Sequence, residues 1–203
     1  MKLFYKAGAC SLSPHIVMAE LGFVYETEQV DLATKKMASG DYLAVNPKGS
    51  VPALKMESGE ILTEGAIIVQ YLCELKPEGN LLKDKYRALE WMNYIATELH
   101  KNALTPFFTL DRMMQSAEGK TEYRASLVKN LETKIHFISQ KMGSNHYLMG
   151  NEFTAPDAYL FTCLSWTGML KFELSKWPNI VSYMERMRQR PSVIRAMTEE
   201  GLL

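Results

Sequence analysis

The sequence predicts an α/β domain with the element order βαβαββα, followed by an all-helical bundle. Strand and helix patterns alternate through the first third of the chain, and strand patterns mostly vanish after it. Between the two parts lies a stretch with Pro77 and Gly79, which is typical of a linker. Hydrophobic residues make up 47% of the 203 residues, enough for well-buried cores. We therefore place an α/β domain at residues 1–76, a linker at 77–85 and a helical domain at 86–203.

The α/β domain opens with a short strand pattern at Lys2–Lys6. Ser11–Pro14 is typical of a helix start, because serine can cap a helix and proline fits its first turn. Gly22 ends this helix, since glycine is the usual residue just beyond a helix. A second strand follows at Tyr25–Leu32, and a short helix is expected at Gly40–Val45.

The same domain closes with a hairpin and a helix. Asn46–Gly49 has the composition of a turn. Ser58-Gly59 separates two strand patterns, Val51–Met56 and Glu60–Thr63, which predicts a hairpin. Gly65–Leu75 follows as a helix because its apolar residues recur at helical spacing. The apolar face of this helix consists of Ile68, Tyr71, Leu72 and Leu75.

The helical domain is predicted from apolar stripes and capping patterns. Thr154 and Asp157 have the spacing of a capping box, which starts one helix. Asn179–Met187 is a further helix that stops before Pro191. The two stripes are Leu89, Met92, Ala96 and Leu99, with Pro106 just past them, and Leu127, Leu131, Ile135, Ile138 and Met142, ended by Gly143.

Charge and cysteine usage narrow the class of protein. Lysine plus arginine equals aspartate plus glutamate, 23 each, so the chain lacks the basic balance that nucleic acid or an anionic membrane would require. Its apolar runs fall short of the roughly 20 residues that a membrane helix needs. Three cysteines without a close pair favour a reducing compartment, and we expect the cytosol. No C-x-x-C or H-E-x-x-H spacing predicts a metal site.

Cys10 is the first candidate for chemistry, because it follows a strand and precedes a helix start. The N–H groups at a helix N-terminus stabilise a thiolate, so we expect a pKa below the usual value of about 8.5. Cys10-Ser11-Leu12-Ser13 is similar to a redox C-x-x-C with serine as its second member, which would need an external thiol such as glutathione. A small buried cysteine is the alternative interpretation. Cys73 and Cys163 lie in helical apolar patterns and are expected to pack in the core.

Two further segments could bind a peptide-like ligand. Val51-Pro52 starts a strand, where proline leaves the edge open, so a ligand could pair with the Val51 backbone. Thr63–Ala66 lies where a strand ends and a helix begins, and free N–H groups there bind carboxylates. Glu64 could pair with an ammonium group at the same time. An ordinary edge proline and an ordinary capping turn are the alternatives, and each motif alone is weak.

Taken together, these segments resemble the cytosolic glutathione transferases, most closely the bacterial beta class. The resemblance implies that the α/β domain is thioredoxin-like. Each matching segment is short, but the set spans the whole chain and is jointly specific. The segments are Lys2–His15, Asn46–Leu54, Leu62–Gly65, Glu90–Lys101, Phe153–Phe161 and Glu199–Leu203.

The resemblance implies roles for individual residues. Cys10 would contact the sulfur of glutathione and form a mixed disulfide with it, and Val51, before a cis Pro52, would pair with its cysteinyl backbone. Glu64 and Gly65 would hold the γ-glutamyl end, where many relatives have serine in place of glycine. Thr154 and Asp157 match a folding motif. Tyr5 is expected as a wall residue. The remaining ligand positions are Lys35 towards the glycyl end, the pair His100 and Lys101, and Asn93 and Thr97, in part from the neighbouring subunit of a homodimer.

Two chemistries then compete. In the first, glutathione is activated as a thiolate and attacks a hydrophobic electrophile, with Ser11 and the Cys10 region as hydrogen-bond donors and His100 as an acid or base. In the second, Cys10 cycles between a thiolate and a glutathione mixed disulfide, as a reductase or peroxidase would. We rank conjugation, a detoxification chemistry, first. Glutathione is a co-substrate here, and no metal is expected.

The electrophile site and the class of function have alternatives. Ordinary core packing explains the candidate pocket residues better than a pocket does. A noncatalytic carrier of apolar ligands or a dimerisation module could use the same fold, because fold does not fix function. A dehalogenase or isomerase would need a dedicated pocket that the sequence does not reveal. The candidate pocket residues are Phe107, Phe108, Met113, Met114 and Trp166.

Overall fold

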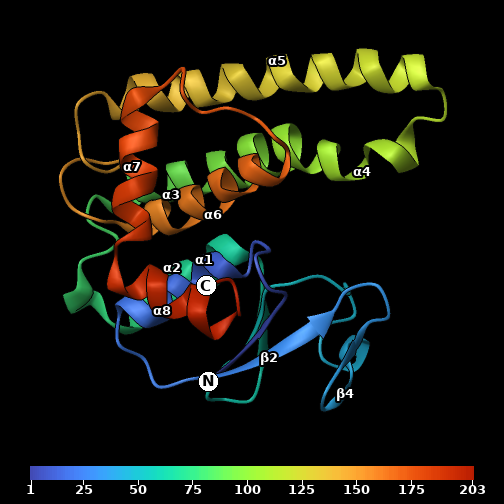
Figure 1. Cartoon of the computed structure of the whole chain (residues 1–203). Helices are drawn as coiled ribbons and strands as arrows, with labels where there is room; N and C mark the ends of the chain where they lie inside the picture. Colours follow the sequence, from blue (N-terminus) through green and yellow to red (C-terminus); the bar gives the residue numbers. More distant parts are fainter.

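The computed structural model describes all 203 residues as a sheet layer with helices beneath a layer of longer helices (Figure 1). The sheet has the strand order β4-β3-β2-β1-β5-β6. Strand β1 (Lys2–Tyr5) pairs in parallel with β2 (Glu26–Asp31) and antiparallel with β5 (Ala53–Lys55). Strand β6 (Ile61–Thr63) completes the edge beside β5. No helix combines the length and apolar character needed to cross a membrane.

Each of the two helices of the α/β part follows a strand of the sheet. Helix α1 (Leu12–Glu20) follows β1, and α2 (Gly65–Leu75) follows β6. A short turn of 3-10 helix, η2 (Pro77–Gly79), leads from α2 into the helical layer. The remaining elements are α3 (Lys85–Tyr94), the π-helix η3 (Ile95–Leu104), α4 (Thr105–Met113), α5 (Ala117–Met142), α6 (Ala155–Met169), α7 (Pro178–Arg188) and α8 (Pro191–Glu199).

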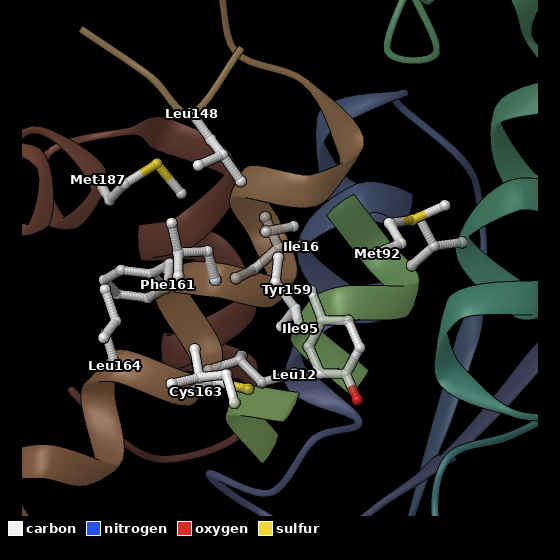
Figure 2. Packing of buried hydrophobic residues seen from close by; sticks show 14 of the residues in the cluster. Leu12, Ile16, Met92, Ile95, Leu148, Tyr159, Phe161, Cys163, Leu164 and Met187 are labelled. Atoms are coloured by element: carbon white, nitrogen blue, oxygen red, sulfur yellow. The ribbon is translucent and has the colours of Figure 1, made fainter. Parts of the chain in front are cut away.

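Helix α1 is the centre of the molecule. Every residue from Leu12 to Met18 is buried, because α1 packs against α2, α6 and α8 as well as the sheet. Figure 2 shows Leu12 and Ile16 of α1 among side chains of α6, with Cys163 beside Leu12. Cys73 and Cys163 are buried, as predicted. The loop between β1 and α1, which carries Cys10, is therefore fixed at both ends by buried elements.

The predicted fold class is confirmed: a sheet with helices is followed by an all-helical second part. Helix α5 buries all five members of the second apolar stripe and ends at Gly143, which has φ 57°. The capping box is also present: the carboxylate of Asp157 accepts hydrogen bonds from the Thr154 backbone N–H and hydroxyl, both at 2.8 Å.

Pro106 lies just past the first stripe and occupies the first turn of α4, where its missing N–H costs nothing, so the chain stays helical from α3 to α4. Helix α7 stops before Pro191, as predicted, and Pro191 then begins α8, a helix that was not predicted. Two other details differ from the prediction. The predicted helix at Gly40–Val45 is one 3-10 turn, η1 (Tyr42–Ala44), preceded by a tiny hairpin of β3 (Lys36–Met37) and β4 (Gly40–Asp41). Leu75 is exposed because α2 buries Val69 and Cys73 in its place.

Candidate active site around Cys10

Cys10 lies in the last residues of the loop before α1 and is half-buried. Its thiol donates a hydrogen bond to the backbone carbonyl of Val51, with Sγ and O 3.3 Å apart. The backbone N–H groups of Cys10 and Ser11 lower the pKa of the thiol. The structure therefore brings together Cys10 and Val51, which are 41 residues apart in the chain. The expected open strand edge is not present, because β5 pairs with β1 on one side and with β6 on the other, and Val51 lies just before it.

The pKa of Cys10 corrects the expectation from its position. Burial raises the pKa of the thiol to about 11, and this outweighs the lowering by Lys101 and by the two N–H groups. The hydrogen bond to the Val51 carbonyl requires the protonated thiol as donor. A helix N-terminus alone therefore does not make this thiol a thiolate in the ligand-free protein.

Ser11 holds the loop and does not cap α1. Its hydroxyl accepts a hydrogen bond from the N–H of Lys6 and donates one to the carbonyl of Lys6, both at 3.2 Å. No side-chain capping bond is present at Ser11, so this detail of the prediction is wrong. The helix start itself is confirmed, with α1 beginning at Leu12. Ser11 is fully buried and already uses its hydroxyl within the fold.

The N-terminus of α2 forms one side of the site. Gly65 lies against Pro52, because a Cβ added to Gly65 would be 3.5 Å from the Pro52 Cγ atom. The Val51-Pro52 peptide bond is cis. Glu64 precedes α2 with φ 70°, a conformation uncommon outside glycine. Its carboxylate, which raises the pKa of Cys10, pairs with Lys48 at 2.7 Å.

Lys35, between β2 and β3, reaches the turn that precedes Val51. Its Nζ donates to the carbonyl of Gly49, 2.7 Å away. Gly49 has φ 62° and lies two residues before Val51. The Lys35 side chain therefore binds the turn that leads into Val51. Lys48 was not predicted from the sequence, although its place in the Asn46–Gly49 turn put it near the site. Lys35 and Lys48 give this edge two cations.

Aromatic side chains of the helical layer form the other side. The His100 ring, in η3, lies edge-on to Trp166 with centroids 4.8 Å apart, and its Nδ1 is 2.8 Å from the Tyr159 hydroxyl. Trp166 donates from its indole N–H to the carbonyl of Gly8, 2.8 Å away, which places it beside the Cys10 loop. Phe108, half exposed, meets Trp166 edge-on. Burial and Lys101 lower the pKa of His100 to about 4.

The other predicted residues divide into two groups. Lys101 is exposed and acts electrostatically on Cys10. Tyr5 is buried with its ring centroid 6.0 Å from that of His15, and burial raises the pKa of its phenol. Asn93 and Thr97 are exposed one turn apart, where the Thr97 hydroxyl donates to the Asn93 carbonyl. Neither hydrogen-bonds to the group around Cys10.

Of the candidate pocket residues, two lie near the site. Trp166 and Phe108 are joined to the Cys10 loop through Gly8. Phe107 is buried in the core, as the alternative interpretation proposed. Met113 is exposed at the end of α4, and Met114 follows it. Tyr159 was not predicted as a site residue. A tyrosine in a buried helix has the same sequence pattern whether its hydroxyl binds His100 or its ring only packs in the core.

Comparisons with known proteins show the family to which the chain belongs. The family model for the N-terminal domain of glutathione S-transferases matches residues 7–75, and the model for the C-terminal domain matches residues 80–191. The chain belongs to the glutathione S-transferase family. It is 43% identical to glutathione S-transferase GstA of Escherichia coli O157:H7, with each sequence covered completely.

Solved transferases share the whole fold. A beta-class glutathione S-transferase of Sphingomonas chungbukensis is 36% identical with a TM-score of 0.89, and each chain is covered completely. A sphingomonad glutathione S-transferase complexed with glutathione is 33% identical with the same TM-score and the same complete coverage. The resemblance to the bacterial beta class is confirmed.

Proposed function

We propose that this transferase conjugates glutathione to electrophilic hydrophobic compounds at the site around Cys10. One observation carries the proposal: the Cys10 thiol rests on the Val51 carbonyl beside the N-terminus of α2, in a chain that matches glutathione S-transferases over its full length. This arrangement offers a sulfur, the Val51 backbone just before β5 and a helix N-terminus to one tripeptide. The related sphingomonad structure contains glutathione.

The proposed glutathione contacts use the groups around Cys10. The backbone of Val51 pairs with the cysteinyl residue as an added strand would. The N-terminus of α2 at Gly65 receives the γ-glutamyl carboxylate, and Glu64 exchanges its partner Lys48 for the γ-glutamyl ammonium group. Lys35 and Lys101 attract the net negative charge of glutathione. Asn93 and Thr97 would serve the partner subunit's site in a homodimer.

The conjugation step places the glutathione sulfur near Cys10 and the N–H groups of Cys10 and Ser11. These donors stabilise a glutathione thiolate, which attacks the electrophile on the side lined by Trp166 and Phe108. Because its pKa is about 4, His100 is neutral at pH 7, so its imidazole has a lone pair that can accept a hydrogen bond or, transiently, a proton. Ser11 contributes its backbone N–H, because its hydroxyl is bound to Lys6.

Thiol–disulfide exchange at Cys10 is a second activity of the same site. The Cys10 thiolate attacks the glutathione sulfur of a mixed disulfide between glutathione and another thiol, which releases that thiol and leaves glutathione on Cys10. Reduced glutathione then attacks the Cys10 mixed disulfide, restores the Cys10 thiol and leaves as oxidised glutathione, so the substrate disulfide is reduced and glutathione is oxidised. No second cysteine can resolve the disulfide from within the site, because Ser13 occupies the position where C-x-x-C has one.

We place the enzyme in the cytosol as a homodimer whose α/β part spans residues 1–76 and whose helical part spans 86–203. The alternative function is a noncatalytic carrier or dimerisation module. The group formed by Cys10, Val51-Pro52 and Glu64 favours the enzyme, because a carrier has no chemical need for a thiol at the N-terminus of a helix.

The test measures conjugation of glutathione to a general aromatic electrophile, together with the intact mass after incubation with oxidised glutathione. We expect turnover by the wild type and one glutathione adduct that reductant reverses and Cys10→Ala abolishes. Absence of turnover with tight binding of apolar dyes would favour the carrier. An adduct that survives Cys10→Ala would overturn exchange at Cys10 while leaving conjugation in place.

A further inference from the structure

The peptide of Gly8, two residues before Cys10, is held from both sides by the C-terminal part of the chain. Its N–H donates to Oε2 of Glu200 at 2.9 Å, and its carbonyl accepts from the indole of Trp166 at 2.8 Å. Gly8 has φ 70°, so it sits at a turn where most side chains would be strained. Both bonds span more than 150 positions of the chain.

Glu200 is itself fixed in place. Its side chain is fully buried, and Oε1 lies 2.9 Å from Nδ1 of His15 on α1. The other ring nitrogen of His15 lies 2.8 Å from Glu199, which also accepts bonds from Tyr25 and Arg195. Beyond them Leu202 covers Gly8, because a Cβ on Gly8 would be 3.6 Å from the Leu202 side chain. The last residues thus lie on the loop that carries Cys10.

We propose that Glu200 is a positioning residue for Cys10: by holding the Gly8 peptide against α1, it fixes the loop that places the Cys10 sulfur on the Val51 carbonyl. The two carboxylate oxygens of Glu200 bind different elements: Oε2 accepts from the Gly8 N–H in the loop, and Oε1 lies against His15 of α1. Without this carboxylate the Gly8 N–H loses its acceptor, and a buried donor left unsatisfied is unfavourable.

Two consequences separate positioning from general stability. A looser loop exposes Cys10 and weakens its bond to Val51, so the thiol reacts faster with a small alkylating reagent. The same looseness misplaces the groups that bind the glutathione sulfur, so kcat falls, and a misplacement of about 1 Å can cost on the order of 100-fold. The kcat consequence rests on the proposed function, whereas the alkylation consequence does not.

The experiment compares Glu200→Ala, Glu200→Gln and Glu199→Ala in the full chain. Glutamine retains an oxygen for the Gly8 N–H and an amide N–H for His15, so it is the conservative variant. Glu199→Ala is the matched control, because it removes a neighbouring carboxylate from the same histidine without touching Gly8. Readouts are the alkylation rate of Cys10 by iodoacetamide, assigned by peptide mass, and kcat and KM for glutathione. Thermal melts confirm that each variant is folded.

We expect Glu200→Ala to raise the alkylation rate of Cys10 at least about fivefold and to lower kcat about tenfold or more, with KM changing less. Glu200→Gln and Glu199→Ala should stay within about twofold of the wild type in both readouts. Equal effects of Glu199→Ala and Glu200→Ala, or a glutamine variant as impaired as alanine, would overturn the proposal. If Glu200→Ala does not fold, Glu200→Asp takes its place, because the shorter side chain draws the carboxylate away from the Gly8 N–H, and an unchanged alkylation rate there would overturn the proposal.

A wild type that forms no conjugate would count against the proposed function alone. The alkylation rates of the folded variants would still decide whether Glu200 positions Cys10. Cys73 and Cys163 are buried and serve as internal controls, because their peptides should remain unmodified in every folded variant.

Discussion

At the scale of single residues, burial competes with hydrogen bonding at the Cys10 sulfur. Two backbone N–H groups and Lys101 favour the thiolate, but removal from water favours the thiol more strongly. Glutathione would bring its own sulfur next to these N–H groups. The site as built therefore suits stabilisation of a bound thiolate more than permanent activation of the cysteine.

This balance predicts the pH dependence of Cys10 alkylation in the ligand-free wild type. Because burial raises its pKa to about 11, the rate with iodoacetamide should rise about tenfold per pH unit from pH 7 to pH 10 without a plateau. The alkylation rate at each pH is measured by quenching the reaction at a series of times and quantifying the alkylated Cys10 peptide by mass spectrometry. A plateau that begins below pH 8 would show that the helix N-terminus outweighs burial after all.

His100 gives a second prediction at this scale. Its pKa of about 4 lies below the usual value near 6.5, so the unfolded chain binds more protons between these values. The native state therefore loses stability as pH falls from about 6.5 to 4, by up to about 3 kcal/mol from this group. Urea unfolding at several pH values should show a smaller loss in His100→Gln, and the imidazole should not titrate by NMR between pH 6 and 8.

At the scale of elements, the start of α6 depends on one carboxylate. Asp157 is fully buried and accepts hydrogen bonds from Thr154 and from the Leu148 N–H at 2.9 Å. Burial raises its pKa to about 6 despite these bonds. Because α6 carries Tyr159 and Trp166, this cap also sets the position of the aromatic side of the site.

Asp157→Ala should destabilise the protein by about 3 kcal/mol, because it removes a helix cap and leaves the buried N–H of Leu148 without an acceptor. The free energy of unfolding in urea measures the loss. Asp111→Ala is the control, since its side chain is 91% exposed, and it should change stability by less than about 0.5 kcal/mol. Equal stability of the two variants would contradict this account of the cap.

The elements also show which features a sequence can predict. The capping box, the stripe of α5 and the turn before Val51 depend on local chemistry, and all three were predicted correctly. Helix α8 was not predicted, because proline both ends and begins helices, and the packing around Pro191 decides that a new helix starts there.

The site residues divide in the same way. Cys10 and Val51 carry local signals, whereas the roles of Trp166 and Glu200 come from contacts across more than 150 residues. A single sequence does not reveal contacts of that kind. The pKa of Cys10 was misjudged for the same reason, because its largest cause is burial by distant elements.

At the scale of the whole molecule, the two parts of the chain share one core. Helix α1 lies between the sheet and helices α6 and α8, and residues near the C-terminus complete its surroundings (Figure 1). Arg190 before α8 binds Glu20 at the end of α1 with Nε and Oε2 2.8 Å apart, and Ser192 donates to the same carboxylate at 2.6 Å. Part of the apolar core of the α/β part is therefore formed by side chains of the helical part.

This sharing predicts that residues 1–76 do not fold cooperatively alone. In the fragment, α1 would lose the cover of α6 and α8, so apolar residues that are fully buried in the protein, such as Ile16 and Val17, would meet water. We expect retained far-UV but lost near-UV circular dichroism, binding of a hydrophobic dye, and no sigmoidal urea transition. The control is the full chain with a protease site inserted at the exposed Lys83–Asp84 and then cut. This cut protein should unfold in one transition, because the shared core rather than the linker joins the two parts. A single sharp transition of the fragment in both spectral regions would show instead that the α/β part is complete without its partner.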